Sequence, residues 1–183
     1  MFRRKVNNSL CGVLNDFDLS IPVTRVLTSK QRTGTTPYMA VDLLENPPTT
    51  HLYRHDLESL FYVIVVLTSR YHKGREMNEK PPLQAWFDLG AEALVDAKLA
   101  FLYLPAPQPT PDFQKIENAI GRMRKMFRDA SVARADHYDK IHYAKMRSVV
   151  ATEKQAIPEF DESTLGGHVD FNKFGEILDE AII

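Results

Sequence analysis

Residues 56–71 read DLESLFYVIVVLTSRY, and every position from Leu60 to Leu67 is apolar. The stretch is longer than a typical strand of about 5–6 residues, so we predict a helix even though Val63 to Val66 favour strands. A bilayer span requires about 20 apolar residues, and this run has fewer than half as many. The pattern therefore predicts a helix without a solvent face, buried at the centre of a soluble domain.

Both ends of this stretch carry residues that are typical of helix ends. Asp56 is suited to cap the amino end, and Glu58 complements the partial positive charge of the first turn. Arg70 and Lys73, followed by Gly74, suit the last turn and the end of a helix. We therefore expect the helix to extend from Asp56 to Tyr71.

Length and composition indicate one globular domain inside the cell. The chain has 183 residues, of which 44% are hydrophobic and 26% charged, and its net charge of -1 favours neither nucleic acid nor a membrane surface as a partner. Cys11 is the only cysteine, so an intrachain disulfide is excluded. Polar residues follow Lys5 where a signal peptide needs an apolar core, which predicts a cytoplasmic or nuclear protein that is not secreted.

The first twenty residues predict two short strands joined by a turn. Leu10 to Leu14 is an apolar run, Asn15-Asp16 is turn-like, and Phe17 to Leu19 is the second candidate strand. Asp16 and Asp18 have two interpretations at this stage. They are either residues of an Asx turn or carboxylates that bind a metal ion.

A polar segment from Thr24 to Thr36 predicts an exposed loop. It is either a plain connector or a segment whose order responds to phosphorylation, with Arg25, Lys30 and Arg32 as anchors for the added charge. After a turn at Gly34, we expect about two helical turns from Met39 to Glu45, which Pro47 ends.

Three segments in this order resemble the second half of a eukaryotic-type protein kinase domain. They are Asp16–Asp18 (DFD), Arg32–Asp42 (RTGTTPYMAVD) and Arg54–Leu60 (RHDLESL). The DFD variant and the HDLES helix entry are similar to the fungal-type protein kinase family. Pro81–Phe87 (PPLQAWF) and Gly166–Val169 (GGHV) are similar to that family as well.

The resemblance implies roles for several residues. Asp16 matches the carboxylate that holds Mg²⁺ against the phosphates of ATP. Asp42 matches an acid that pairs with a buried arginine, for which Arg124 and Arg128 are candidates. Asp56 matches the helix-entry aspartate that holds the backbone of the catalytic loop. The loop that contacts the protein substrate comprises Thr33, Gly34, Thr35, Thr36 and Tyr38, and Thr35 matches the threonine that bonds to the catalytic loop.

Two positions depart from the family pattern, since Val41 stands where a proline is usual and Asp42 where a glutamate is usual. The sequence also contains no Gly-rich phosphate loop, no strand lysine with a helix glutamate, and no His-Arg-Asp catalytic loop. We therefore expect one incomplete domain over residues 1–183, the carboxyl-terminal lobe from the metal-binding motif onward. No residue is assigned as catalytic, and this chain alone is not expected to bind Mg²⁺ and ATP measurably.

Two functions follow from the resemblance. Completed by an amino-terminal half, the chain is part of a serine/threonine kinase that acts on a protein substrate. Otherwise it is a pseudokinase or truncated remnant that binds partner proteins.

The remainder of the chain predicts helices packed around the central one, so the fold class is mainly α. Apolar residues recur at helical spacing from Leu83 to Phe101, from Phe113 to Phe127 and from Phe171 to Ala181, and Asp170 is suited to open the last helix. A more polar helix is expected over Ser131–Lys154. The prolines from Pro105 to Pro111 predict an extended connector, with a ligand for a proline-binding domain as the alternative.

Two possible metal sites lack the ligands that they would need. An EF-hand loop centred on Gly167 would place Lys173 where the closing glutamate must stand. His51 and His55 have the spacing of zinc ligands, but they lie in a predicted loop far from the one cysteine.

Overall fold

The computed structural model describes residues 2–6, 9–13, 35–45, 50–77, 79–148 and 158–182. The chain divides into two compact units, Met1–Gln31 and Arg32–Ile183. In the first unit, β1 (Phe2–Val6) and β2 (Ser9–Val13) form an antiparallel hairpin in which Phe2 faces Val13 and Val6 faces Ser9. The strand predicted at Leu10 is thus present, but it pairs with the preceding segment. The second candidate strand, Phe17 to Leu19, lies outside the described residues.

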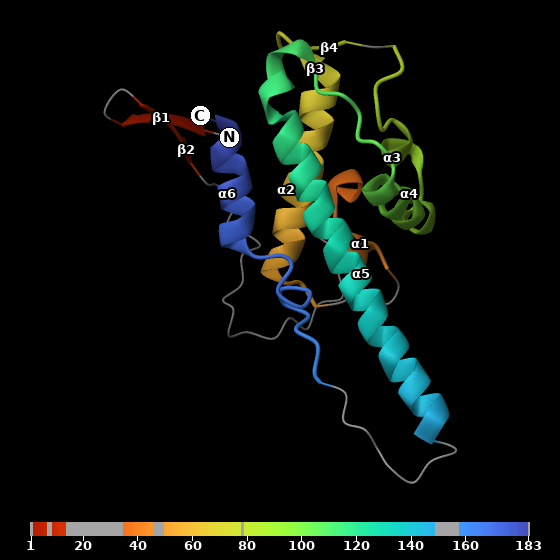
Figure 1. Ribbon diagram of the computed structural model, residues 1–183. Helices are drawn as coiled ribbons and strands as arrows, with labels where there is room; N and C mark the ends of the chain where they lie inside the picture. The colour runs from red at the N-terminus through yellow and green to blue at the C-terminus, as the bar shows by residue number, and fades with distance from the viewer. Residues whose placement is uncertain are drawn as a thin grey trace. The chain divides into compact units, whose positions relative to one another are not determined.

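The second unit is helical, which confirms the predicted mainly α class (Figure 1). Its two very short strands, β3 (Tyr71–His72) and β4 (Arg75–Glu76), form a tight hairpin directly after the central helix, where Gly74 has a positive φ of 73°. The helices are η1 (Thr36–Tyr38), α1 (Val41–Leu44), α2 (Tyr53–Arg70), α3 (Ala85–Asp88), α4 (Ala91–Tyr103), η2 (Pro111–Ile116), α5 (Glu117–Ser148) and α6 (Phe171–Ile182).

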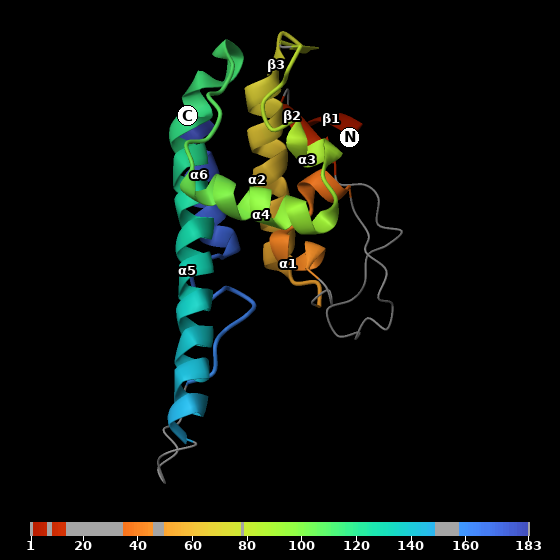
Figure 2. The same cartoon turned by 90° about the vertical axis from the view of Figure 1, so that its right-hand side faces the viewer.

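Helix α2 occupies the centre of this unit, as predicted. It contacts α5, α6, η1 and η2, and α4 lies across α2 and α5 (Figure 2). Phe61 and Tyr62 have no exposed surface, and they join an aromatic core: Phe61 stacks on Phe127 at 5.3 Å between ring centroids, and Trp86 meets Tyr62 edge-on at 5.2 Å. Burying each such side chain contributes about 1.5–3 kcal/mol. The aromatic residues of the chain therefore account for much of the core.

The predicted amino end of α2 is wrong by three residues. The helix begins at Tyr53, and its N-cap is Leu52, whose backbone N–H donates to Nδ1 of His55 at 3.0 Å. Asp56 lies inside the first turn, where its exposed carboxylate contacts His51 Nε2 at 2.9 Å. His55, the third residue of the helix, accepts the N–H of the N-cap residue, so an imidazole and not the carboxylate of Asp56 contacts the backbone at this helix end.

The prediction that α2 has no solvent face is also wrong. Tyr53, Leu60, Leu67 and Tyr71 are 43%, 43%, 46% and 36% exposed. Tyr53, Leu60 and Leu67 are seven residues apart, which places them on one side of the helix, and Tyr71 directly follows the last helical residue, Arg70. We call these four residues the α2 stripe. The opposite side, which includes Val65 with no exposed surface, faces the core.

The isolated chain is expected to self-associate through the α2 stripe, because each uncovered apolar side chain forgoes about 1.5–3 kcal/mol. The double variant Leu60→Gln/Leu67→Gln should shift the chain from aggregate to monomer in sedimentation velocity. Val65→Gln is the matched control, since it places the same amide in the core and should increase aggregation. A wild-type chain that is monomeric at tens of micromolar would contradict this expectation.

The helix predicted from Leu83 to Phe101 is divided in two. The short α3 ends at Asp88, and Gly90 is the N-cap of α4. Leu94 and Phe101 are buried as predicted, whereas Phe87 is 38% exposed. Glycine lowers helix propensity and suits a cap, so it interrupts a pattern whose apolar spacing alone suggested one helix.

The two helices predicted between Phe113 and Lys154 are largely one element. Helix α5 is continuous from Glu117 to Ser148, while Phe113 lies in η2 with a non-helical φ of -121°. The last turns of α5 extend beyond the other helices of the unit (Figures 1 and 2).

The final helix begins where the sequence predicted. Asp170 Oδ1 accepts the backbone N–H groups of Asn172 and Lys173 at 2.8 and 3.0 Å, which caps α6. Phe174 and Ile177 are buried as expected, but Phe171 is 71% exposed and the prediction that it faces inward is wrong.

Candidate functional site

The residues that the sequence singled out lie in different surroundings. Asp16, Thr33 and Gly34 lie outside the described residues. Thr35 and Thr36 are exposed at η1, and Tyr38 is half-buried, with its ring edge-on to Phe87 at 5.8 Å. Asp42 is buried in α1, and Asp56 points to solvent. Among the candidate residues that the structure describes, Asp42 is therefore the one that a network of contacts surrounds.

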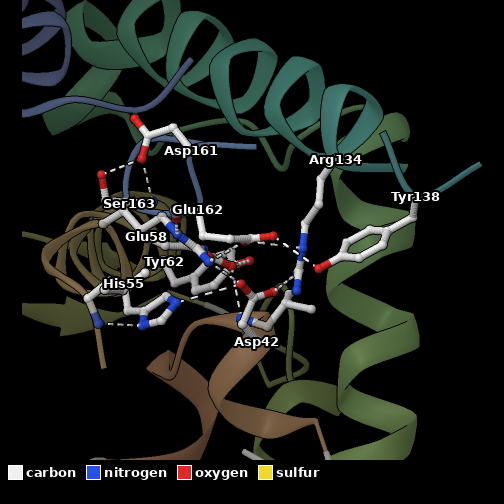
Figure 3. A network of polar contacts seen from close by, with 12 residues as sticks. Asp42, His55, Glu58, Tyr62, Arg134, Tyr138, Asp161, Glu162 and Ser163 are labelled. Carbon is white, nitrogen blue, oxygen red and sulfur yellow. Dashed lines mark hydrogen bonds and ion pairs between the residues drawn. The ribbon is translucent and has the colours of Figure 1, made fainter. Parts of the chain in front are cut away.

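Asp42 is held by two arginines from different helices, of which Figure 3 labels Arg134. Arg54 of α2 donates from Nη2 to Oδ2 at 2.6 Å, and Arg134 of α5 donates from Nη1 to Oδ1 at 2.6 Å. Arg54 also donates from Nε to the backbone carbonyl of Glu162 at 2.6 Å, and His55 Nε2 lies 3.6 Å from Oδ2 of Asp42. We call these five residues the Asp42 cluster.

The resemblance suggested that Asp42 pairs with an arginine, and the structure shows such a pair, but with different arginines. Arg124 donates to the backbone carbonyl of Leu104, and Arg128 lies 3.8 Å from Asp129. The spacing of the apolar residues along α5 could have indicated that Arg134 lies on the buried side of this helix. Its buried positions Ile120, Met123, Phe127 and Ala130 follow steps of three and four, and the next step of four reaches residue 134.

The electrostatics of the cluster favour a charged Asp42. Burial alone would raise the pKa of its carboxyl, but His55, Arg54 and Arg134 together hold that pKa well below its usual value. Arg54 is 3% exposed and Arg134 has a raised pKa despite its burial, because Asp42 and Glu162 face it. The cluster is thus a largely buried junction of α1, α2 and α5, in which a charged Asp42 is held between two arginines.

A second buried polar group lies beside it. Glu58 Oε1 accepts the backbone N–H of Val41 at 3.0 Å and the hydroxyl of Tyr62 at 2.6 Å. Lys98 of α4 has no exposed surface and donates to the backbone carbonyl of Met39. Burial raises the pKa of the Glu58 carboxyl, which these hydrogen bonds partly oppose. Burial lowers the pKa of Lys98 to about 7, an effect that the nearby Glu58 opposes.

A cavity of about 350 Å³ opens between these groups and the apolar core. Charged and polar residues from α1, α2 and α5 line one part, and apolar residues from α4, α5 and the 158–170 segment line the other. The lining comprises Val41, Asp42, Glu45, Arg54, Glu58, Leu99, Leu102, Phe127, Ser131, Arg134, Ala135, Tyr138 and Leu165.

This arrangement fixes a backbone segment. Its polar groups contact one another and the backbone of residues 39–42. Within the part of the chain that the structure describes, no group of three or more His, Cys, Asp or Glu side chains is placed to hold a metal ion. None of the described helices is long and apolar enough to cross a membrane.

Among known proteins, one family model matches part of the chain. No curated protein and no solved structure matches the chain. The segments Pro81–Phe87 and Gly166–Val169 fall outside the part of the chain that matches a family model. Residues 1–68 match the family model described as fungal protein kinase, and the resemblance carried by the motifs from Asp16 to Leu60 is thereby confirmed for this part of the chain.

Proposed function

We propose that the chain is the carboxyl-terminal, large-lobe portion of a fungal-type serine/threonine protein kinase. One observation carries the proposal. Within the stretch that matches the family, the segment ending at Asp42 is bound to the central helix through Arg54, and Arg134 binds it from the far side. A kinase works by positioning its substrate and stabilising charge, so the segment that contacts the substrate must be held rigidly.

In this proposal, each candidate residue has a limited task. Asp16 holds Mg²⁺, which in the complete domain neutralises the phosphates of ATP. Residues 33–38 contact the protein substrate, and Tyr38 rests on Phe87, which Arg70 covers at 4.3 Å from the ring centroid. Asp42 anchors the end of this loop, and Asp56 holds the catalytic loop. The phosphate-covering loop, the lysine and glutamate pair, and the general base are supplied by residues other than these 183.

An alternative function is a pseudokinase or truncated remnant that binds proteins. The α2 stripe favours it, since an exposed apolar surface on a central helix is typical of an interaction site. The same stripe also suits the proposed kinase, in which the missing half of the domain would cover it.

Reconstitution tests the proposal. The chain is co-expressed with an amino-terminal kinase segment that carries the small lobe and the catalytic loop, and transfer of labelled phosphate to a generic protein substrate is measured. We expect transfer that Asp16→Asn abolishes. Asp139→Asn, an exposed acid on α5, is the matched control and should retain full activity. A stable complex that transfers no phosphate would favour the binding module instead.

A further inference from the structure

Two buried side chains of opposite charge contact the backbone of the same short segment. Val41 donates its N–H to Glu58 Oε1 at 3.0 Å, and Met39 accepts a hydrogen bond at its carbonyl from Lys98 Nζ. Glu58 belongs to α2 and Lys98 to α4, so two separate helices hold the segment. Two consecutive peptide groups on either side of Ala40, which has no exposed surface, are thereby fixed.

Other side chains hold the two charged groups in position. The hydroxyl of Tyr62 donates to Glu58 Oε1 at 2.6 Å. The Lys98 ammonium lies 4.0 Å from the centroid of the Tyr62 ring and 5.5 Å from that of Trp86, within the range of cation–π attraction. Tyr62 thus links the acid and the base, and neither long side chain is free to leave its backbone partner.

The burial of a glutamate and a lysine, instead of two apolar residues, indicates a role beyond packing. Burying a lysine and a glutamate incurs a large desolvation penalty, and an apolar pair of similar volume often gives equal or greater stability. Glu58 and Lys98 supply something that an apolar pair lacks, namely directional hydrogen bonds to Val41 and Met39. Such bonds select one position of the segment among several that would bury the same surface.

We infer that Glu58 and Lys98 are positioning residues that together hold the backbone of Met39–Val41, and we call this pair the clamp. The clamp sets the placement of the loop ending at Tyr38. It also sets the direction in which Asp42 approaches its arginines. The link to substrate binding rests on the proposed function. The clamp itself rests on the contacts alone.

Hydrogen exchange of the full 183-residue chain, kept soluble by fusion to a carrier protein, tests the clamp. In Lys98→Met and Glu58→Leu, exchange of the amides at residues 39–43 should become about tenfold faster, which corresponds to the loss of one hydrogen bond. Amides in the core of α5, such as Met123, should keep their wild-type rates. Glu58→Gln retains an acceptor oxygen for Val41 and Tyr62, and it should rescue most of the protection.

Lys125→Met is the matched control, because Lys125 is exposed on α5 and pairs with Asp129. This variant should leave the amide exchange rates of residues 39–43 unchanged. The inference is overturned if Lys98→Met leaves the exchange of Val41 unchanged, or if the variants accelerate exchange throughout the unit, which would indicate a purely structural role. If Glu58→Leu fails to fold, Lys98→Met and Glu58→Gln still decide the question. The measurement needs neither ATP nor a partner, so its result is independent of whether the proposed function holds.

Discussion

Replacing Asp42 by alanine is expected to lower the free energy of unfolding of the helical unit by about 3–5 kcal/mol, a large share of the roughly 5–15 kcal/mol that a domain has. The variant leaves Arg54, which is 3% exposed, and Arg134 facing each other without their shared carboxylate. Urea denaturation followed by circular dichroism at 222 nm measures the change in a carrier fusion of the chain.

Asp129→Ala is the control for this experiment. Asp129 also pairs with a basic residue, Lys125, but both are exposed on α5. This variant should lower the free energy of unfolding by less than about 1 kcal/mol. An Asp42→Ala variant that is no less stable than Asp129→Ala would contradict the assignment of the Asp42 cluster as a buried junction.

The same cluster predicts acid sensitivity. Because the folded-state pKa of Asp42 is below its ordinary value of 3.8, its ionised form adds stability above that pH, and this contribution is lost as the pH falls further towards the folded-state pKa. The difference in stability between the wild type and Asp42→Asn should therefore be constant from pH 5 to 7 and decrease below about pH 4.

The second large effect is an absence of phosphoryl transfer by this chain alone. Catalysis requires the phosphate-covering loop, the lysine and glutamate pair, the general base and a second metal ligand together, and the motifs that supply them in protein kinases do not occur in this sequence. Loss of a general base alone costs about 10²–10⁴ in rate. We expect no transfer from labelled ATP and no thermal shift with Mg²⁺ and ATP.

The variant Asp16→Asn separates the possible outcomes of that assay. Activity that survives the substitution would come from a contaminating kinase. Activity that the substitution removes would overturn this expectation and imply a catalytic base elsewhere in the chain.

The sequence was sufficient to predict the central helix, because the apolar run lies in a stretch longer than a typical strand, with residues at both ends that suit helix ends. It did not predict that Leu60 and Leu67 would be exposed, since exposure depends on how many other elements cover the helix. The N-cap was missed for a related reason: His55 reaches Leu52 only in the folded geometry, whereas Asp56 matched the usual composition of a cap.

For the candidate site, the family motif identified Asp42 but not its partners. Arg54 is twelve positions away and Arg134 is 92 positions away, so their approach depends on the packing of three helices. The sequence also did not identify Glu58 and Lys98, because a glutamate near the amino end of α2 and a lysine on α4 are ordinary surface residues by composition. Only the contacts with the backbone of Met39 and Val41 distinguish Glu58 and Lys98 from such surface residues.

The separation of 92 positions between Asp42 and Arg134 also sets an order of events during protein synthesis. At about 5–20 residues per second, the ribosome adds Arg134 roughly 5–18 s after Asp42. Until then the nascent chain has Arg54 and His55, but not Arg134, to stabilise the Asp42 carboxylate. The loop ending at Tyr38 therefore reaches its final placement late in translation, and a chain whose translation stops before residue 134 leaves that loop without its second arginine.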